Sequence, residues 1–220
     1  MITQEEFQNL CTKFNQKYIE AKKNITTIKN LSSYSLQPIE QQVADVGNAI
    51  ECKKGCSHCC QLRVVVFPHE AISIYFYLNK ILNKQKIKDI KEKINKQFAI
   101  VKPLSEHEHF IQNIECPLLE DNKCLVYPVR PIACAGYHSA SEEACKHSNE
   151  HPEIVGNENG GIPQIVAISE AQSVQNTVAL EVLRKNRDDS EQYELIKALH
   201  HIFKAPSLIQ TWKNGRKYIK

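Results

Sequence analysis

The chain carries a dense run of cysteines early in its sequence, and this run constrains the fold more than any other feature. Four cysteines lie within nine consecutive residues of the segment ECKKGCSHCC: Cys52, Cys56, Cys59 and Cys60. A second group follows after 55 residues without cysteine: Cys116, Cys124, Cys134 and Cys145. A close-packed core does not require thiols at this density, whereas zinc and iron–sulfur sites do. We therefore expect folding to bring the two groups together around bound metal.

The composition is typical of a soluble intracellular protein. With 220 residues the chain can bury a full core without cross-links, so small size does not explain the cysteines. The first residues, MITQEEFQNL, lack the apolar run of a signal peptide, and no stretch is apolar enough for a membrane span. We expect a cytoplasmic protein with no membrane partner. Thiols stay reduced in that compartment, which favours metal or redox chemistry over disulfides.

The basic charge of the chain depends on whether its thiols are counted. The formal charge is +3 at pH 7, and lysine and arginine are spread along the sequence without a long basic run. Eight thiolates around two divalent ions would carry a net charge of −4 and would change the charge of the chain to −1. The sequence therefore gives no electrostatic indication of a nucleic-acid partner.

Helical periodicity covers most of the chain outside the second cysteine group. Thr3 and Glu6 fit a capping box before an apolar stripe, and Cys11 beside that stripe is expected to be a buried thiol. A polar stretch over 31–38 is expected to separate this helix from a second one. Pro68 suits the start of a further helix, which continues over 71–82. Later periodic stretches cover 87–98, 165–183 and 193–203, and Ser207 is expected to cap a last short helix.

The stretch 103–163 loses periodicity, gathers prolines and carries the second cysteine group. A compact domain rarely tolerates so much irregular chain unless something else orders it, and metal is the expected cause. The predicted fold is mainly α, a single helical domain with an irregular, metal-ordered cysteine-rich segment. We divide it into an N-terminal helical region (1–49), a cysteine-cluster metal-chelating domain (50–150) and C-terminal helices on the same core (151–220).

The spacing of the cysteines leaves the number of metals open. Cys56 and Cys59 have the CxxC spacing at which a tight turn directs two thiolates to one ion, and Cys52 can join them. Side chains of adjacent residues diverge, so Cys59 and Cys60 more easily serve two metals, or one metal and one redox role. Eight thiolates suffice for two four-cysteine sites, or for one iron–sulfur cluster with thiols to spare.

Charged and imidazole side chains near the cysteines are secondary candidates. Six basic residues lie beside the predicted ligands and could lower thiol pKa values, with Arg130 the best placed: Lys53, Lys54, Arg63, Lys123, Arg130 and Lys146. Three histidines lie near enough in sequence to supply nitrogen ligands, although bystander roles are the simpler interpretation: His58, His138 and His147.

The motifs CKKGCSHCC, VVVFPHEA and CPLLEDNKCLVYPVRPIACAGYHSASEEAC together resemble the YkgJ-like cysteine-cluster family, which is built on a zinc- or iron-chelating CxxCxxCC domain. The resemblance covers residues 50–147, and the endings APSLIQTW and GRKYI are also similar to full-length members. It implies a bacterial metal-chelating protein. Flagellin lysine methylases carry a similar cysteine motif and are thought to use an iron–sulfur cluster, so the resemblance leaves enzymatic activity open.

The family pattern matches individual residues of this chain. The shared cysteines match Cys52, Cys56, Cys59, Cys60, Cys116, Cys124 and Cys134, and Cys145 matches a further cysteine of many members. Tyr127, Arg130 and Pro131 match a YxxRP element. Ala135 stands where the family usually has arginine, so any role of that arginine is missing here.

Four functional interpretations follow. The first is a metalloprotein in which the eight clustered cysteines bind zinc or iron and the metal orders the irregular segment. The second is an iron–sulfur enzyme or electron-transfer protein, although no phosphate loop or methyl-donor loop accompanies the cysteines. The third is an adaptor that docks on a protein partner through its helices, and the fourth is thiol exchange at Cys59 and Cys60. The sequence assigns no catalytic residue.

Overall fold

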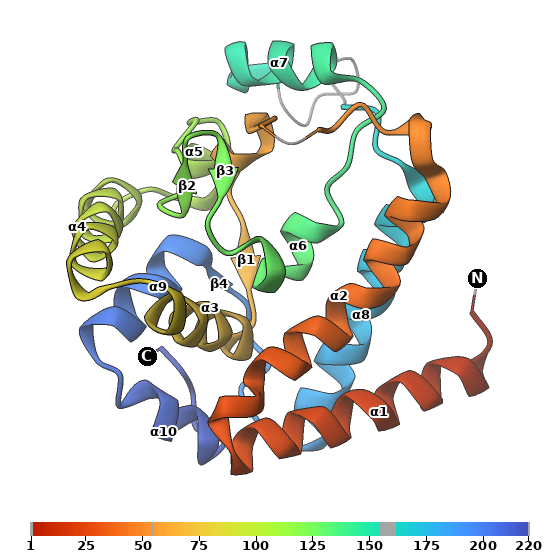
Figure 1. The fold of residues 1–220 in the computed structure, drawn as a ribbon, viewed down its shortest axis with the longest axis vertical. Coiled ribbons are helices and arrows are strands. Elements are labelled where there is room, and N and C mark those ends of the chain that lie inside the picture. The colour runs from red at the N-terminus through yellow and green to blue at the C-terminus, as the bar shows by residue number, and fades with distance from the viewer. Residues whose placement is uncertain (1, 54, 155–161, 220) are drawn as a thin grey trace.

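The computed structural model describes residues 2–53, 55–154 and 162–219, and it confirms the predicted mainly helical fold (Figure 1). The α-helices of these residues are α1 (Gln4–Lys23), α2 (Ile28–Val46), α3 (Pro68–Ile81), α4 (Lys84–Val101), α5 (Glu106–Phe110), α6 (Ile132–Ala135), α7 (Glu142–Glu150), α8 (Val166–Lys185), α9 (Leu195–Lys204) and α10 (Leu208–Lys213). The strands are β1 (Val65–Val66), β2 (Leu119–Glu120), β3 (Lys123–Cys124) and β4 (Tyr193–Glu194). Short 3₁₀ turns are η1 (Ile25–Thr27), η2 (Gly47–Ala49), η3 (His58–Gln61), η4 (Tyr127–Val129) and η5 (Pro152–Ile154).

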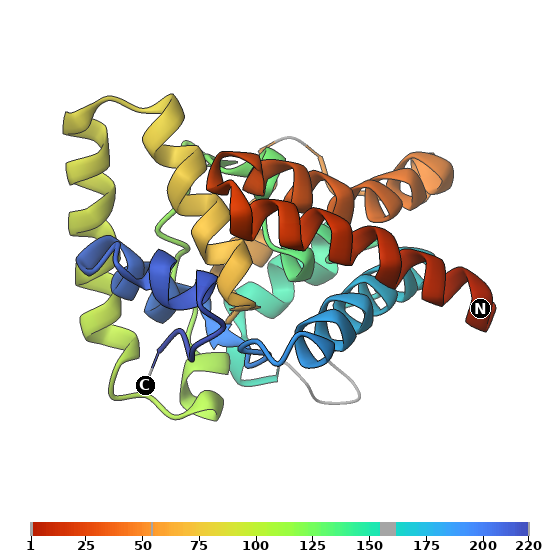
Figure 2. The ribbon, with the colours of Figure 1, turned by 90° about the horizontal axis from the view of Figure 1, so that it is seen from below.

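Helices α1, α2 and α8 pack side by side and form one wall of the molecule (Figures 1 and 2). Helix α1 begins as the sequence predicts, because the Thr3 hydroxyl caps the Glu6 amide and the Glu6 carboxylate accepts the Thr3 amide. The predicted polar separator at 31–38 is wrong, since α2 runs unbroken through it and through Pro38. The serines of this stretch bond inside the helix bundle: the Ser32 hydroxyl donates to Ser73 Oγ at 2.7 Å.

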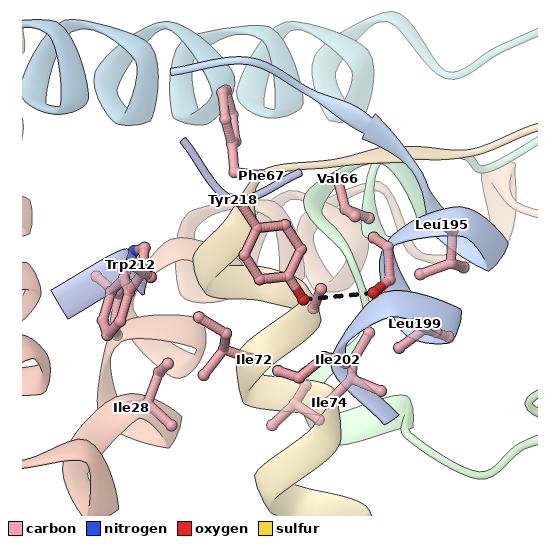
Figure 3. Packing of buried hydrophobic residues seen from close by; sticks show 14 of the residues in the cluster. Ile28, Val66, Phe67, Ile72, Ile74, Leu195, Leu199, Ile202, Trp212 and Tyr218 are labelled. Carbon is pink, nitrogen blue, oxygen red and sulfur yellow. Dashed lines mark hydrogen bonds between the residues drawn. The ribbon is translucent and has the colours of Figure 1, made fainter. Parts of the chain in front are cut away.

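A second layer contains α3, α4, α9 and α10, and it is joined to the chain after the first cysteine run by a small sheet. Strand β1 pairs antiparallel with β4, and Pro68 begins α3 as predicted. Figure 3 shows the core beneath this layer, where Tyr218 and Trp212 pack on isoleucines of α2, α3 and α9. The buried Tyr218 hydroxyl donates to the Ala198 carbonyl at 3.3 Å, so its polar end is satisfied.

The main core cluster draws on all three predicted parts of the chain. Phe14, Leu118 and Leu199 belong to the same cluster of buried apolar side chains, and Cys11 lies buried within it as expected. The division at residues 49 and 150 stays a prediction. Within the described residues, no helix combines the length and apolar character that crossing a membrane requires.

The stretch from residue 103 to 154 consists of short elements and turns, as the loss of periodicity indicates. One element differs from the prediction: α7 is a regular nine-residue helix. In Figure 1 it lies at one end of the molecule, and it packs against η3 of the first cysteine run. Helix α7, near the end of the cysteine-rich segment, therefore packs back on the first cysteine run.

Candidate metal centre

The first cysteine run is shaped by two tight turns. The Cys56 amide donates to the Lys53 carbonyl at 2.9 Å, and Gly55 within this turn has a φ of +95°, which glycine adopts without strain. Turn η3 follows, and the Cys60 amide donates to the Ser57 carbonyl at 2.9 Å. The run therefore turns on itself twice within nine residues, so its four thiols are not spread along an extended strand.

Backbone hydrogen bonds fasten the start of this run to the segment that precedes α7. The Glu51 amide donates to the Ser139 carbonyl at 3.1 Å, and the Ser139 amide donates to Cys52 Sγ at 3.4 Å. The Glu142 amide at the start of α7 donates to the Glu51 carboxylate at 2.7 Å. Cys52 thus lies against the strand-like segment that leads to Cys145, 93 residues later in the sequence.

The end of the run is fastened instead to the β2–β3 hairpin. The Cys116 amide donates to the Cys60 carbonyl at 2.7 Å, and Leu119 pairs with Cys124 across the hairpin. Asp121 and Asn122 form its tip with positive φ angles of 49° and 57°, which agrees with the turn chemistry of these residue types. This pairing brings Cys60, Cys116 and Cys124 into one neighbourhood.

Cys134 lies on the short helix α6, which is attached to the core by a buried carboxylate. Glu70, only 6% exposed, accepts the Phe67 amide at the start of α3 and the Ile132 amide at the start of α6, both at 2.8 Å. Glu70 stands in the first turn of α3, and through these two bonds it joins α3 to the cysteine-rich segment. Gly136 after α6 lies so close to the Gln172 side chain that a Cβ atom there would clash.

Four thiols form an inner set that we define as Cys60, Cys116, Cys124 and Cys134. The pKa of Cys116 is raised to about 12, first by burial and then by the negative charges of Cys124 and Cys60. Burial also raises the pKa of Cys134 well above its ordinary value, together with the charges of Cys116, Cys124 and Cys60. The pKa of Cys124 is raised by burial and by the charge of Cys60. Every pair within the inner set therefore interacts electrostatically.

Three further thiols form an outer set of Cys52, Cys56 and Cys145. Burial raises the pKa of Cys145, and the negative charges of Cys52 and Cys56 add to this effect. The pKa of Cys52 is likewise raised by burial and by the charge of Cys56. Cys145 is 6% exposed on the inner face of α7. Each pair of the outer set is thus also within electrostatic reach.

Cys59 lies where the two sets meet. Its pKa is raised first by a hydrogen bond with Cys60 and by burial, and then by the charges of Cys60, Cys134 and Cys52. The same hydrogen bond lowers the pKa of Cys60. The charges of Cys145, Cys59 and Cys52 also act on the Tyr137 hydroxyl, whose pKa is raised first by burial. The eight predicted ligands therefore gather in one region, while Cys11 lies apart in the core.

A carboxylate that the sequence analysis missed belongs to this neighbourhood. Three side chains among the described residues each place one potential metal-ligand atom within 4.8 Å of the other two: Cys56, His58 and Glu142. Glu142 also binds Lys53 through an ion pair of 2.6 Å. No motif in the sequence identifies Glu142 as a potential ligand. Ser141 could have indicated it, because Ser141 caps α7 and so places Glu142 in the first turn of that helix.

The basic residues beside the cysteines are mostly engaged with carboxylates. Lys53 pairs with Glu142, Arg63 with Glu106 at 2.6 Å, and Lys146 with Glu150 at 3.8 Å. Arg130, the basic residue that the sequence favours, also acts on a thiol, because its charge lowers the pKa of Cys124 against the larger effect of burial. Arg130 itself is buried, pairs with Glu40 at 3.1 Å and stacks on the Tyr127 ring at 3.9 Å. Lys54 lies outside the described residues.

The donor chemistry fits zinc or iron. All nine cysteines are among the described residues and each is a free thiol. Thiolate is the preferred ligand of zinc sites and of iron–sulfur clusters, and two groups of three or four thiols are the arrangement that such sites need. Burial raises the pKa of Cys52, Cys116, Cys124, Cys134 and Cys145, so metal binding by these thiols must release protons.

Comparison with known proteins supports the same chemistry. Residues 51–154 match the model of the CxxCxxCC family, described as a "Putative zinc- or iron-chelating domain". No curated protein and no solved structure matches the chain at the significance applied. The matched range contains all eight clustered cysteines, the β2–β3 hairpin and α7. The family match therefore covers the cysteine-rich part of the chain and leaves the N-terminal and C-terminal helices outside it.

Proposed function

We propose that the chain is a metal-binding protein that holds zinc or iron through its two groups of cysteines. The proposed ligands are Cys52, Cys56, Cys59, Cys60, Cys116, Cys124, Cys134 and Cys145. The observation that carries the proposal is the convergence of these eight free thiols, from segments more than 50 residues apart, into one region of the fold. Thiolates are the preferred ligands of zinc sites and of iron–sulfur clusters, so free thiols at this density favour a bound cation.

The proposed role of the metal is to order the cysteine-rich segment between the helical layers. That segment is built from a two-residue hairpin pair, a four-residue helix and a nine-residue helix, none of which is stable in isolation. Because the ligand sets exist only in the folded chain, the free energy of metal binding contributes directly to folding. A structural zinc scaffold is the simplest form of this proposal.

An iron–sulfur cluster is the alternative occupant, because four cysteine thiolates also hold [2Fe–2S] and [4Fe–4S] clusters. An enzymatic or electron-transfer role, as suggested by the resemblance to flagellin lysine methylases, depends on that alternative. The buried Arg130 beside Cys124 suits either occupant, since a thiolate-rich site carries excess negative charge. The two occupants differ in colour, which makes them easy to separate.

The test is elemental analysis of the full chain purified without oxygen, together with its absorption spectrum. An iron–sulfur cluster gives a brown protein that absorbs near ~400 nm, whereas zinc, with a full d shell, gives a colourless one. The Cys11→Ala variant is the matched control, because Cys11 is a buried thiol outside the cluster. It should keep the full metal content. A chain that contains neither zinc nor iron, and takes up neither on reconstitution, contradicts the proposal.

A further inference from the structure

We infer that Cys56, His58 and Glu142 form a site for one divalent ion, zinc(II) or iron(II), and that this site leaves a coordination position open to solvent. The inference rests on the proposed metal-binding function and deepens it, because it adds a nitrogen and an oxygen ligand to the thiols. A set of one thiolate, one imidazole and one carboxylate differs from the cysteine sets that hold iron–sulfur clusters. The ion at this place is therefore a single one.

The three donor atoms already lie near the separation that one ion requires. Sγ of Cys56, a ring nitrogen of His58 and a carboxylate oxygen of Glu142 lie within 4.8 Å of one another. Zinc bonds of about 2.0–2.3 Å place tetrahedral donors about 3.5 Å apart. Side-chain movements of about 1 Å therefore bring the three donors onto one ion, and the backbone can stay in place.

The first cysteine run presents two of the donors in consecutive turns. The Cys56 amide donates to the Lys53 carbonyl at 2.9 Å, which closes the first turn. The Cys60 amide donates to the Ser57 carbonyl at 2.9 Å, which closes the second turn around His58. These bonds involve only backbone atoms, so the turns leave the thiol and the imidazole available to an ion.

The third donor comes from the start of α7, far along the sequence. The Ser141 hydroxyl accepts the Ala144 amide at 3.0 Å, and the Glu142 amide donates to the Glu51 carboxylate at 2.7 Å. Helix α7 also packs against η3, the turn that contains His58. These contacts fix the backbone of Glu142 beside the first run without using its own carboxylate.

Lys53 is the cation that pairs with this carboxylate in the structure. Its ammonium lies 2.6 Å from Oε2 of Glu142, and its side chain is 69% exposed. An exposed ion pair of this kind contributes little stability, and the lysine can withdraw into solvent. A divalent ion bound by Glu142 would therefore displace Lys53 at small cost.

The number of donors and their exposure indicate an exchangeable ion. Within the described residues this group contains three donors, and each of them is partly exposed. Three protein ligands and one open position are typical of catalytic zinc sites, whereas structural sites use four protein ligands. An ion held in this way supplies Lewis acidity to a small molecule bound at the open position. The other cysteines stay available for a structural metal.

The experiment titrates the full chain with cobalt(II) without oxygen, in competition with a chelator, and follows the cobalt absorption. His58→Ala and Glu142→Gln should each weaken the binding of one ion by about tenfold or more, because each removes a ligand. Glu143→Gln and His147→Ala are the matched controls, since both residues lie on α7 outside the donor group. Both controls should bind cobalt as the unmodified chain does.

Lys53→Ala separates a metal ligand from an ion-pair partner. It removes the cation that pairs with Glu142 but keeps the carboxylate, so the cobalt affinity should stay the same or rise. Imidazole added to a His58→Gly variant should restore the lost binding, because it replaces the missing nitrogen ligand. Azide added to the unmodified chain should shift the cobalt absorption, because the open position accepts it.

The possible outcomes separate this inference from the proposed function. Unchanged cobalt affinity in either His58→Ala or Glu142→Gln overturns the three-donor site and leaves metal binding by the cysteines intact. Equal losses in Lys53→Ala and Glu142→Gln also overturn it, because only the ion pair would then matter. Absence of an azide effect overturns the open position. No cobalt uptake by the unmodified chain contradicts the proposed function itself. His58 and Glu142 are partly exposed, so we expect both variants to fold, and circular dichroism checks this.

Discussion

The helices α1–α4 and α8–α10, which we call the helical frame, bury side chains such as Phe14, Ile72 and Leu199 completely. The cysteine-rich segment (103–154) instead places half-buried thiols, a buried arginine and short turns at the edge of that frame. Apolar burial of about 25 cal/mol per Å² can stabilise the frame without any ligand. The segment offers less apolar surface for its length and depends more on directional contacts.

Element length makes the same distinction. The helices α1, α2, α4 and α8 have 18 to 20 residues each, whereas α6 has four and β2 and β3 have two. Isolated helices shorter than about 12 residues and single hairpins are marginal in water. We therefore expect the frame to fold first. The cysteine-rich segment and its metal then pack against it at two places, Glu70 and the β1–β4 sheet.

Removal of the metal should break this comparison most strongly. We expect chelation to withdraw about 10 kcal/mol of ordering free energy from the cysteine-rich segment, while the frame keeps most of its helical circular dichroism. Proteolysis should then cut between residues 103 and 154 before it cuts the frame. Cys56→Ser and Cys124→Ser should each lower the metal content and the melting temperature, and Cys11→Ala is the control for a cysteine outside the sites.

Equal loss of structure in both regions on chelation would contradict the expectation that the frame stays folded without metal. In that case the far-ultraviolet signal would fall together with protease resistance, and no fragment that contains α1–α4 would survive digestion.

Acid should act on the frame through His69. The ring is buried among aromatic side chains, stacked on Phe67 at 5.7 Å, and neither ring nitrogen has a hydrogen-bond partner among the described residues. Burial lowers its pKa from 6.5 to about 3. The unfolded chain therefore binds the proton first, so the stability contributed by neutral His69 is present above pH 6.5 and is lost as pH falls toward 3.

The His69→Phe variant should remove this acid sensitivity. Its stability relative to the unmodified chain should rise as pH falls, by about 3 kcal/mol between pH 7 and pH 4. Urea unfolding of both proteins across that range, with chelator present so that metal loss is equal, measures the difference. Parallel stability curves would show that His69 is not buried in its neutral form.

Much of the frame was predictable because its signals are local. The capping box at Thr3, the helix start at Pro68 and the apolar stripes all act within one or two helical turns. The unbroken α2 was not predictable from polarity, because the polar Ser32 is buried and its hydroxyl donates to Ser73 on α3. Helix α7 escaped detection because its sequence, EEACKHSNE, buries only Cys145 and Ser148.

The candidate site shows the same limit. Cysteine spacing was enough to nominate all eight thiols, and Asp121 and Asn122 are residue types that favour the turn they form. The assignment of thiols to sets was not, because it depends on long-range contacts such as the Cys116–Cys60 and Glu51–Ser139 hydrogen bonds. Glu142 was invisible for a similar reason: only the position of α7 brings it to Cys56.

Glu70 joins the two regions, and its removal should sharpen the comparison. The Glu70→Ala variant leaves the Phe67 and Ile132 amides without their acceptor, which should cost about 2–3 kcal/mol. Because the Ile132 amide begins the helix that carries Cys134, metal affinity should fall as well. Urea unfolding and a chelator competition measure the two effects.

Glu194→Ala is the matched control for Glu70. Glu194 is also buried and accepts two backbone amides, those of Ile196 and Lys197, but both amides belong to α9 of the frame. We expect a similar loss of stability with unchanged metal affinity. Equal loss of metal affinity in both variants would show that any destabilisation of the frame reaches the metal, and that Glu70 has no special position.

The smallest expected effect tests the N-terminal end of the frame. Thr3→Ala removes the hydroxyl that caps the Glu6 amide at 3.2 Å and should cost about 1 kcal/mol. Thr12→Ala on the exposed face of the same helix loses only a bond to the Gln8 carbonyl and should be nearly neutral. Thermal unfolding separates the two variants. Helix α1 shares the main core with Leu118 and Val126. A fall in metal affinity in Thr3→Ala would therefore mean that a loss of about 1 kcal/mol of stability in the frame also weakens the metal site. Unchanged affinity follows if the metal binds at an edge of the frame that is already formed.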